Sequence, residues 1–137
     1  MVGTPNSIIT PQTPREAVNV VSTAETSYTT PVNTALLFTA GAAGARVTKI
    51  TSIPRATVTA TNLLLFVNAA PSNTQLFLID SVLMAANTLA TTTATPRTDW
   101  GYSDTTPLYI AANASVYVAS QVALANGIVT KVEYADY

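Results

Sequence analysis

The sequence predicts an all-β fold, an antiparallel β-sandwich or a small jelly roll or barrel, with an extended N-terminal arm. The 137-residue chain contains about two dozen Thr, and β-branched side chains suit a pleated strand better than a helix. Its apolar segments are short and are separated by turn residues. Several short strands at this spacing are typical of a sandwich or barrel. The length fits one domain, so we expect a single β domain over residues 17–137.

The first 16 residues are expected to form the arm. Pro5, Pro11 and Pro14 lie in this segment, and proline disfavours both a helix and a central strand because it lacks an amide donor. Two interpretations remain open. The segment is either a floppy terminus or an extended arm that orders on a neighbouring subunit, with Ile8 and Ile9 as its apolar anchor.

The domain is expected to contain eight strands, at residues 18–22, 35–39, 46–53, 56–67, 75–83, 108–111, 115–119 and 128–134. Residues 81–90 are rich in good helix formers, so this segment is either a short helix or a bent strand. Asn126 and Gly127 precede the last strand, and this pair favours a hairpin turn with positive φ.

Alternation assigns the faces of the strands. In the last strand the residues expected on one face are Ile128, Thr130, Val132 and Tyr134, and those on the other are Lys131 and Glu133. Such a period of two indicates one buried and one exposed face. The segment Leu63–Val67 is apolar on both faces, so it lies between two layers or is covered by another chain.

Low charge limits the possible partners. Charged residues make up 9% of the chain, with a net charge of -1, against about 25% in an average domain. The six basic residues are spread from Arg15 to Lys131, so they predict no nucleic-acid partner, which needs a basic cluster. Few charges with 48% hydrophobic residues indicate a surface covered by partners, or one kept soluble by Thr, Ser and Asn.

The chain contains no Cys and no His. This excludes disulfides and the common zinc sites, and it removes the usual catalytic bases and thiol nucleophiles. We therefore expect no enzyme activity, no catalytic residue and no cofactor or metal. No apolar stretch approaches the 20 or so residues that span a bilayer, and the N-terminus does not resemble a signal peptide. We expect no membrane partner and synthesis in the cytoplasm.

Acidic and aromatic residues supply the remaining candidate sites. Asp80 lies in an apolar segment, so we expect it to point outward or to meet Arg or Lys. In the loop 97–104, Trp100 and Tyr102 have three interpretations: they pin the loop to the sandwich, form a protein contact, or form a carbohydrate platform. Asp99 and Asp104 supply oxygen ligands for calcium, although their spacing is not that of a calcium loop.

Two stretches carry a resemblance to a known family. They are Thr39–Ile50, TAGAAGARVTKI, and Pro54–Phe66, PRATVTATNLLLF. Together with the composition lacking Cys and His and the Pro-rich leader, they resemble the head decoration (cement) proteins of tailed bacteriophages over residues 17–137. No family residue is matched position by position.

The resemblance implies a virion structural protein on the capsid surface. It implies a β-sandwich or barrel-like module that forms a homotrimer or another cyclic oligomer and locks neighbouring major capsid subunits. Two alternatives remain open: a tail, connector or fibre-base protein of the virion, and a carbohydrate-binding β-sandwich module that uses Trp100 and Tyr102.

Overall fold

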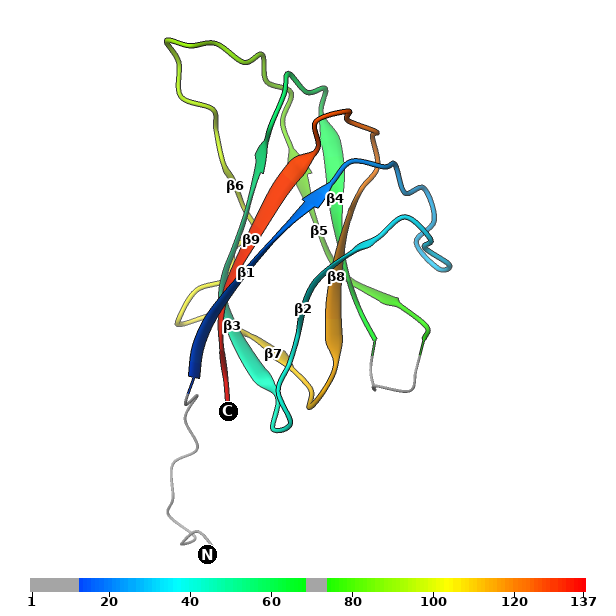
Figure 1. Cartoon of the computed structure of the whole chain (residues 1–137), viewed down its shortest axis with the longest axis vertical. Helices are drawn as coiled ribbons and strands as arrows, with labels where there is room; N and C mark the ends of the chain where they lie inside the picture. Colours follow the sequence, from blue (N-terminus) through cyan, green and yellow to red (C-terminus); the bar gives the residue numbers. More distant parts are fainter. Residues whose placement is uncertain (1–12, 69–73) are drawn as a thin grey trace, which may run out of the picture.

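The computed structural model describes residues 13–68 and 74–137, and the regular elements of these residues are all strands. They are β1 (Thr13–Val21), β2 (Ala35–Thr39), β3 (Ala45–Pro54), β4 (Thr61–Val67), β5 (Phe77–Met84), β6 (Thr98–Asp99), β7 (Leu108–Ile110), β8 (Ser115–Ser120) and β9 (Ile128–Asp136). Figure 1 shows them in two layers that share one long direction. In the described part, no helix is long and apolar enough to cross a membrane.

The strands form two antiparallel sheets. The five-stranded sheet has the order β1-β9-β3-β6, with β7 also paired to β3, and the four-stranded sheet has the order β2-β8-β4-β5. The predicted all-β sandwich is therefore confirmed. The alternative of a short helix over residues 81–90 is wrong, because β5 extends through Met84 and no helix follows it.

The core lies between the two sheets, and the apolar side chains of one face of β8 and one face of β9 point into it. On β9, Ile128 and Val132 are fully buried, whereas Lys131 and Glu133 are exposed. On β8, Val116 and Val118 point into the same core. The predicted faces of β9 are thus confirmed.

A second, smaller apolar cluster lies on the opposite face of the four-stranded sheet. Leu64, Phe66 and Ala119 are fully buried there, and Leu76 and Tyr117 pack against them. Since Leu63 and Leu65 belong to the main core, β4 is buried on both faces. The chain itself therefore covers both faces of this two-sided apolar strand.

Several strand boundaries differ from the sequence expectation. β1 begins at Thr13, so residues 13–16 of the expected arm belong to a strand, and Pro14 is tolerated there because β1 is an edge strand. β4 begins at Thr61, because Val58 exchanges both of its backbone hydrogen bonds with Asn87 instead of with a sheet strand. The two-residue strand β6 has no counterpart in the predicted set.

The turn at Asn126 and Gly127 does not form a hairpin. Gly127 has the expected positive φ, at 76°, but it leads from β8 in one sheet to β9 in the other. A local preference for positive φ fixes the bend of the chain, and it does not determine which strands pair afterwards.

One side of the sandwich is closed between its edge strands. The side chain of Asn19 on β1 donates hydrogen bonds to the carbonyls of Ala35 and Leu36 on β2, at 3.3 and 3.1 Å. The β1 edge also carries Pro14, Arg15 and Glu16, which are residue types that block further strand pairing.

Candidate interaction surfaces

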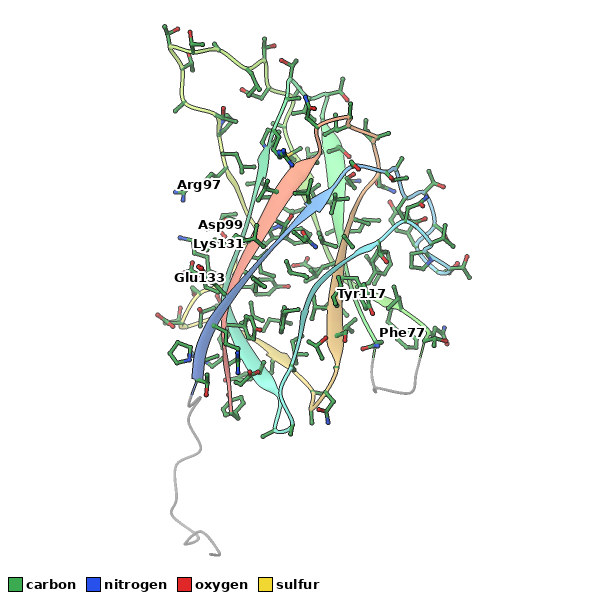
Figure 2. The ribbon with its side chains drawn as sticks, viewed as in Figure 1. Phe77, Arg97, Asp99, Tyr117, Lys131 and Glu133 are labelled. Carbon is green, nitrogen blue, oxygen red and sulfur yellow. The ribbon has the colours of Figure 1, made fainter. Side chains whose placement is uncertain are left out.

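The charged residues are divided unequally between the two sheets. All of them except Glu25 and Asp80 lie on strands of the five-stranded sheet or in the segments that adjoin those strands. On the four strands of the other sheet, Asp80 is the only charged residue. Figure 2 shows this division, with Arg97, Asp99, Lys131 and Glu133 on one side of the molecule and Phe77 and Tyr117 on the other. The domain therefore presents one charged and one nearly uncharged face.

Ion pairs on the charged face join neighbouring strands. Nε of Arg15 lies 2.6 Å from Oδ2 of Asp136, and Nζ of Lys131 lies 3.2 Å from Oε2 of Glu16. The Lys131–Glu16 pair is exposed, and exposed pairs contribute only about 0–1 kcal/mol to folding. The charges of Lys131 and Glu16 thus remain available for contacts with a partner.

A shallow groove of about 590 Å³ runs across this face. The residues that line it are Pro14, Arg15, Glu16, Arg46, Thr48, Asp104, Glu133, Tyr134 and Ala135. Burial, together with the nearby Asp136 carboxylate, raises the pKa of Tyr134. The groove carries both signs of charge and suits a polar partner surface.

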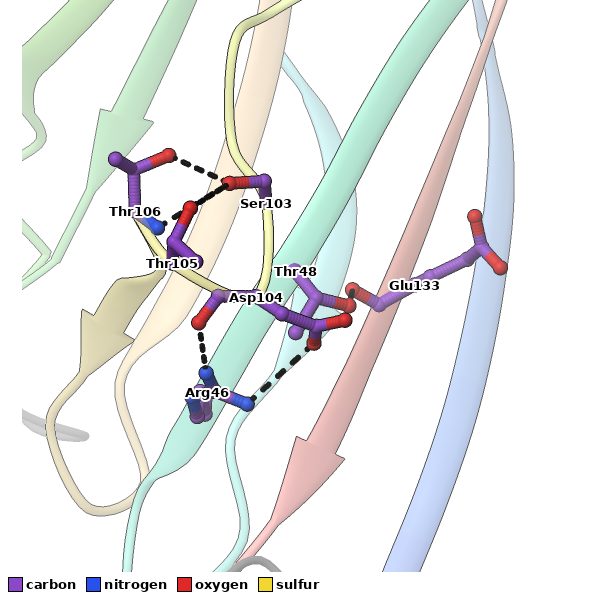
Figure 3. A network of polar contacts seen from close by, with 7 residues as sticks. All are labelled: Arg46, Thr48, Ser103, Asp104, Thr105, Thr106 and Glu133. Atoms are coloured by element: carbon purple, nitrogen blue, oxygen red, sulfur yellow. Dashed lines mark hydrogen bonds and ion pairs between the residues drawn. The ribbon is translucent and has the colours of Figure 1, made fainter.

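The segment 103–106 is fixed to one wall of the groove by Arg46 (Figure 3). The Arg46 guanidinium donates to the backbone carbonyl of Asp104 and lies 3.7 Å from its carboxylate. Within the segment, Oγ of Ser103 is 2.9 Å from Oγ1 of Thr106 and also accepts the Thr106 amide at 3.2 Å. Two residues further along β3, Thr48 donates to the Glu133 carbonyl at 3.3 Å.

The uncharged face carries an apolar row that crosses all four strands. In this row Leu36 is opposite Tyr117, Tyr117 is opposite Phe66, and Phe66 is opposite Leu78. Phe66 is fully buried, whereas Leu36 is 51% exposed. This face can be covered by a partner at a low desolvation cost because it has no charges.

The edge of the same sheet is also apolar. Phe77, Leu78, Ile79 and Leu83 on β5 are all exposed. Beside this edge an apolar cavity of about 280 Å³ opens between β4, β5 and β7. Its apolar lining includes Val67, Ile79, Leu108 and Ile110. The sequence analysis recognised this segment as a strand, but alternation could not identify it as an unpaired edge.

Trp100 lies inside the sandwich. Its side chain is 6% exposed and belongs to the main core, and its Nε1 donates to Oγ of Ser52 at 3.0 Å. Tyr102 is half-buried against the same core. The geometry is that of a loop pinned by its own aromatic side chains, and Trp100 presents little surface to a glycan or a protein.

Asp80 has a different partner from the expected Arg or Lys. Its Oδ2 accepts a 2.6 Å hydrogen bond from the hydroxyl of Tyr102, and its Oδ1 accepts the amide of Ser81 at 2.8 Å. Burial, with the carboxylate of Asp80, raises the pKa of Tyr102 well above its usual range. The pair joins β5 to the segment after β6.

The two candidate calcium ligands are engaged separately. Oδ1 of Asp99 accepts the amide of Gly101 at 2.8 Å, whereas Asp104 pairs with Arg46. In the part of the chain that the structure describes, no three acidic side chains gather closely enough to hold a metal ion. Ile8 and Ile9, the expected anchor of the arm, lie outside the described residues.

Glu25 is the buried acid of the domain, and the sequence analysis assigned it no role. Its carboxylate accepts backbone amides from Val32 at 2.5 Å, Asn33 at 2.7 Å and Ser27 at 3.0 Å. Burial acts to raise the pKa of Glu25, but these backbone hydrogen bonds outweigh it and hold the pKa below its ordinary value. Glu25 therefore organises the connection between β1 and β2.

Comparisons with known proteins identify no family for this chain. No protein-family model matches the chain, and no curated protein matches it. The chain is similar to a chain in a solved structure described as "Structure of infectious bursal disease virus Gt strain", with a TM-score of 0.33 and 14% sequence identity. The match covers 98% of this chain and 40% of that chain.

Proposed function

We propose that this protein is a virion structural protein, a decoration or cement protein that self-associates and binds major capsid subunits on the head of a tailed bacteriophage. The observation that carries the proposal is the division of its surface. One sheet presents ion pairs and a polar groove, and the other presents an uncharged face with an apolar, unpaired edge.

This division suits two kinds of contact made at once. An uncharged face and edge can be buried against another copy at low desolvation cost, while a charged groove provides specificity toward a different partner. Many modest contacts repeated by capsid symmetry then add up to high avidity without a deep pocket.

The carboxylates support a structural role. Asp80 is bonded to Tyr102, Asp136 to Arg15, and Glu25 to backbone amides. Each of these contacts holds two segments together. We therefore propose binding, and no catalysis, as the activity of this domain.

Capsid binding is tested by adding the purified protein to phage shells that lack it. The proposal expects the protein to sediment with the shells and to raise the temperature at which they open. If the protein stays in the supernatant at every ratio to shells, the proposal is wrong. Immunogold labelling of complete particles separates the alternatives, since a tail, connector or fibre-base protein would be labelled away from the head.

The role of the charged groove is tested by reversing one of its charges. Glu133 is exposed in the groove, so Glu133→Lys should weaken shell binding several-fold and change its salt dependence. Arg55→Glu makes a charge change of equal size on an exposed residue directly after β3, at the far end of β9 from the groove. This control should bind as the unmodified protein does.

A further inference from the structure

The groove on the charged face contains one carboxylate that has no partner in the described part of the chain. Four of the charged residues that line the groove form ion pairs, which are Arg15–Asp136, Arg46–Asp104 and Glu16–Lys131. Glu133 also lines the groove and is exposed. No ion pair or hydrogen bond joins its carboxylate to another described residue. The charge of Glu133 is therefore free to meet a partner.

The strand register places a second carboxylate beside Glu133. Glu16 on β1 is directly opposite Glu133 on β9, and like charges in this position repel each other. Of the two carboxylates, Lys131 pairs with that of Glu16. On the other side of β9, Lys49 is opposite Glu133, but β3 is bulged between Val47 and Lys49 and no ion pair forms there. The described residues thus leave this pair of carboxylates short of one cation.

A low floor without charge adjoins the two carboxylates. Pro14 is directly opposite Ala135, and each lies two residues from Glu16 or Glu133 on the same face of its strand. Both line the groove, and Ala135 is opposite Arg46 on its other side. Figure 3 shows the Glu133 carboxylate extending from β9 toward β1, away from Arg46. The floor therefore lies between the fixed Arg46 wall and the free carboxylate.

We propose that this groove receives a basic side chain, arginine or lysine, from a partner protein. Its aliphatic stem lies over Pro14 and Ala135, and its charged end meets the carboxylates of Glu133 and Glu16. Side chains of both types cover apolar surface with their stems while the charge stays at the edge. Hydrogen bonds from such a cation to a carboxylate are also stronger than those between neutral groups.

Charge disfavours an acidic partner side chain in the same groove. Arg15 and Arg46 are the cations that line it, and both are already held by carboxylates of this chain. An added carboxylate would have to displace one of those carboxylates, and it would be repelled by Glu133. A basic side chain gains a free carboxylate and breaks no existing contact, so the groove selects its partner by the sign of the charge.

This inference rests on the proposed function, because it specifies the chemistry of the partner that the charged groove contacts. The test uses short peptides and the purified protein, so its failure is distinct from a failure to bind capsid shells.

Blocked tripeptides serve as the probes. Acetyl-Gly-Arg-Gly-amide and its lysine analogue are titrated into the ¹⁵N-labelled protein, and the amide shifts are followed by NMR. Both should give saturable shifts at Glu16, Glu133 and Ala135, and added salt should weaken them. The glutamine and glutamate analogues should shift these amides several-fold less. Equal shifts from the arginine and glutamine peptides, or no saturable shift at these residues, would overturn the proposal.

A neutral variant tests the free carboxylate directly. Glu133→Gln keeps the size of the side chain and removes its charge, so it should lower the affinity for the arginine peptide several-fold. The matched control is Asp99→Asn, which removes an exposed carboxylate of the same face that does not line the groove. Its remaining amide oxygen can still accept the Gly101 amide, as the carboxylate does, and its affinity should equal that of the unmodified protein.

The two variants separate a local contact from a general effect of net charge. A Glu133→Gln protein of unchanged affinity, or an equal loss in Asp99→Asn, would contradict a contact at Glu133. Circular dichroism of both variants checks that they are folded. If Glu133→Gln does not fold, the comparison of the arginine and glutamine peptides on the unmodified protein decides.

Discussion

The indole Nε1 of Trp100 donates a 3.0 Å hydrogen bond to Oγ of Ser52, and the same hydroxyl lies 2.8 Å from Oγ1 of Thr130. The three residues are buried; Trp100 directly follows β6, Ser52 lies on β3 and Thr130 lies on β9. A polar chain of this kind links three neighbouring segments of the five-stranded sheet inside the core. Buried donors and acceptors are costly unless they are paired. Removing one of the three side chains therefore leaves a buried polar atom of another without its hydrogen-bond partner.

Replacing Trp100 by Ala should destabilise the domain by about 3–5 kcal/mol. The change removes a large buried ring, leaves a cavity, and deprives the Ser52 hydroxyl of one partner. Urea unfolding followed by circular dichroism measures the loss. Tyr109→Ala removes a ring that is 65% exposed and should change the free energy of unfolding by only about 0.5 kcal/mol. Equal effects of the two variants would show that Trp100 does not anchor the loop.

The sequence analysis identified the loop aromatics as important but could not assign their role. A Trp beside Gly101 and Tyr102 looks alike in sequence whether it packs inward or outward. The inward position depends on Ser52 and Thr130, which are distant in sequence and carry no local signal for an indole partner. By contrast, the faces of β9 followed from alternation, because burial on one side of a strand repeats every two residues.

Replacing Glu25 by Gln should lower stability at neutral pH by about 1–3 kcal/mol, since hydrogen bonds to a charged acceptor are stronger than those to a neutral one. Because the pKa of Glu25 is lower in the folded chain than its ordinary value of 4.5, its contribution is present above about that pH and is lost as the pH falls through the folded pKa. The stability difference between the two proteins should therefore shrink in acid.

Glu133→Gln is the control for this experiment. Glu133 is exposed on β9, and its removal should cost little at any pH. Urea midpoints measured from pH 7 down to pH 3 for both variants give the comparison. A Glu25→Gln difference that stays constant over this range would contradict the role of the charged carboxylate.

Replacing Tyr102 by Phe should cost about 1–3 kcal/mol at neutral pH, because the Asp80 carboxylate loses the hydroxyl donor at 2.6 Å. Since burial and Asp80 raise the pKa of Tyr102 above its ordinary value of 10.0, its contribution is full below that pH and is lost as the pH rises through the folded value. An absorbance titration should show late-ionising tyrosine absorbance from Tyr102 and also from Tyr134, whose pKa burial raises as well.

In the Phe variant, which keeps the contribution of Tyr134, this late absorbance should fall by the share of one tyrosine. Tyr109→Phe, which alters an exposed ring on β7, serves as the control and should retain it. A late absorbance of unchanged size in Tyr102→Phe would show that the signal comes from other residues.

The alternation of apolar and polar residues cannot predict which strands lie at a sheet edge or which segments pair outside the sheets. The strand-like run at residues 56–60 contains Thr57 and Val58, and both face Asn87 and its neighbours instead of a sheet: Val58 bonds with Asn87, and the Thr57 hydroxyl accepts the Leu89 amide. β-propensity describes a fit to a pleated, half-buried surface, and whether such a surface is present depends on the tertiary fold. The free edge of β5 is likewise a property of the topology, since the same residues between two strands would have an identical pattern.

Two glycines separate the cost of backbone conformation from the cost of a clash. Gly101 and Gly127 both have positive φ, at 93° and 76°, a conformation that costs an L-residue about 1–2 kcal/mol. A Cβ at Gly101 would meet nothing within 4 Å, whereas one at Gly127 would overlap the Val20 side chain and lie 3.1 Å from the Val21 carbonyl. Gly101→Ala should therefore cost only the conformational part, and Gly127→Ala should cost about 1–3 kcal/mol more, as overpacking does. Thermal and urea unfolding of the two variants measure the difference, and equal losses would mean that β1 yields to the added methyl group at the crossing from β8 to β9.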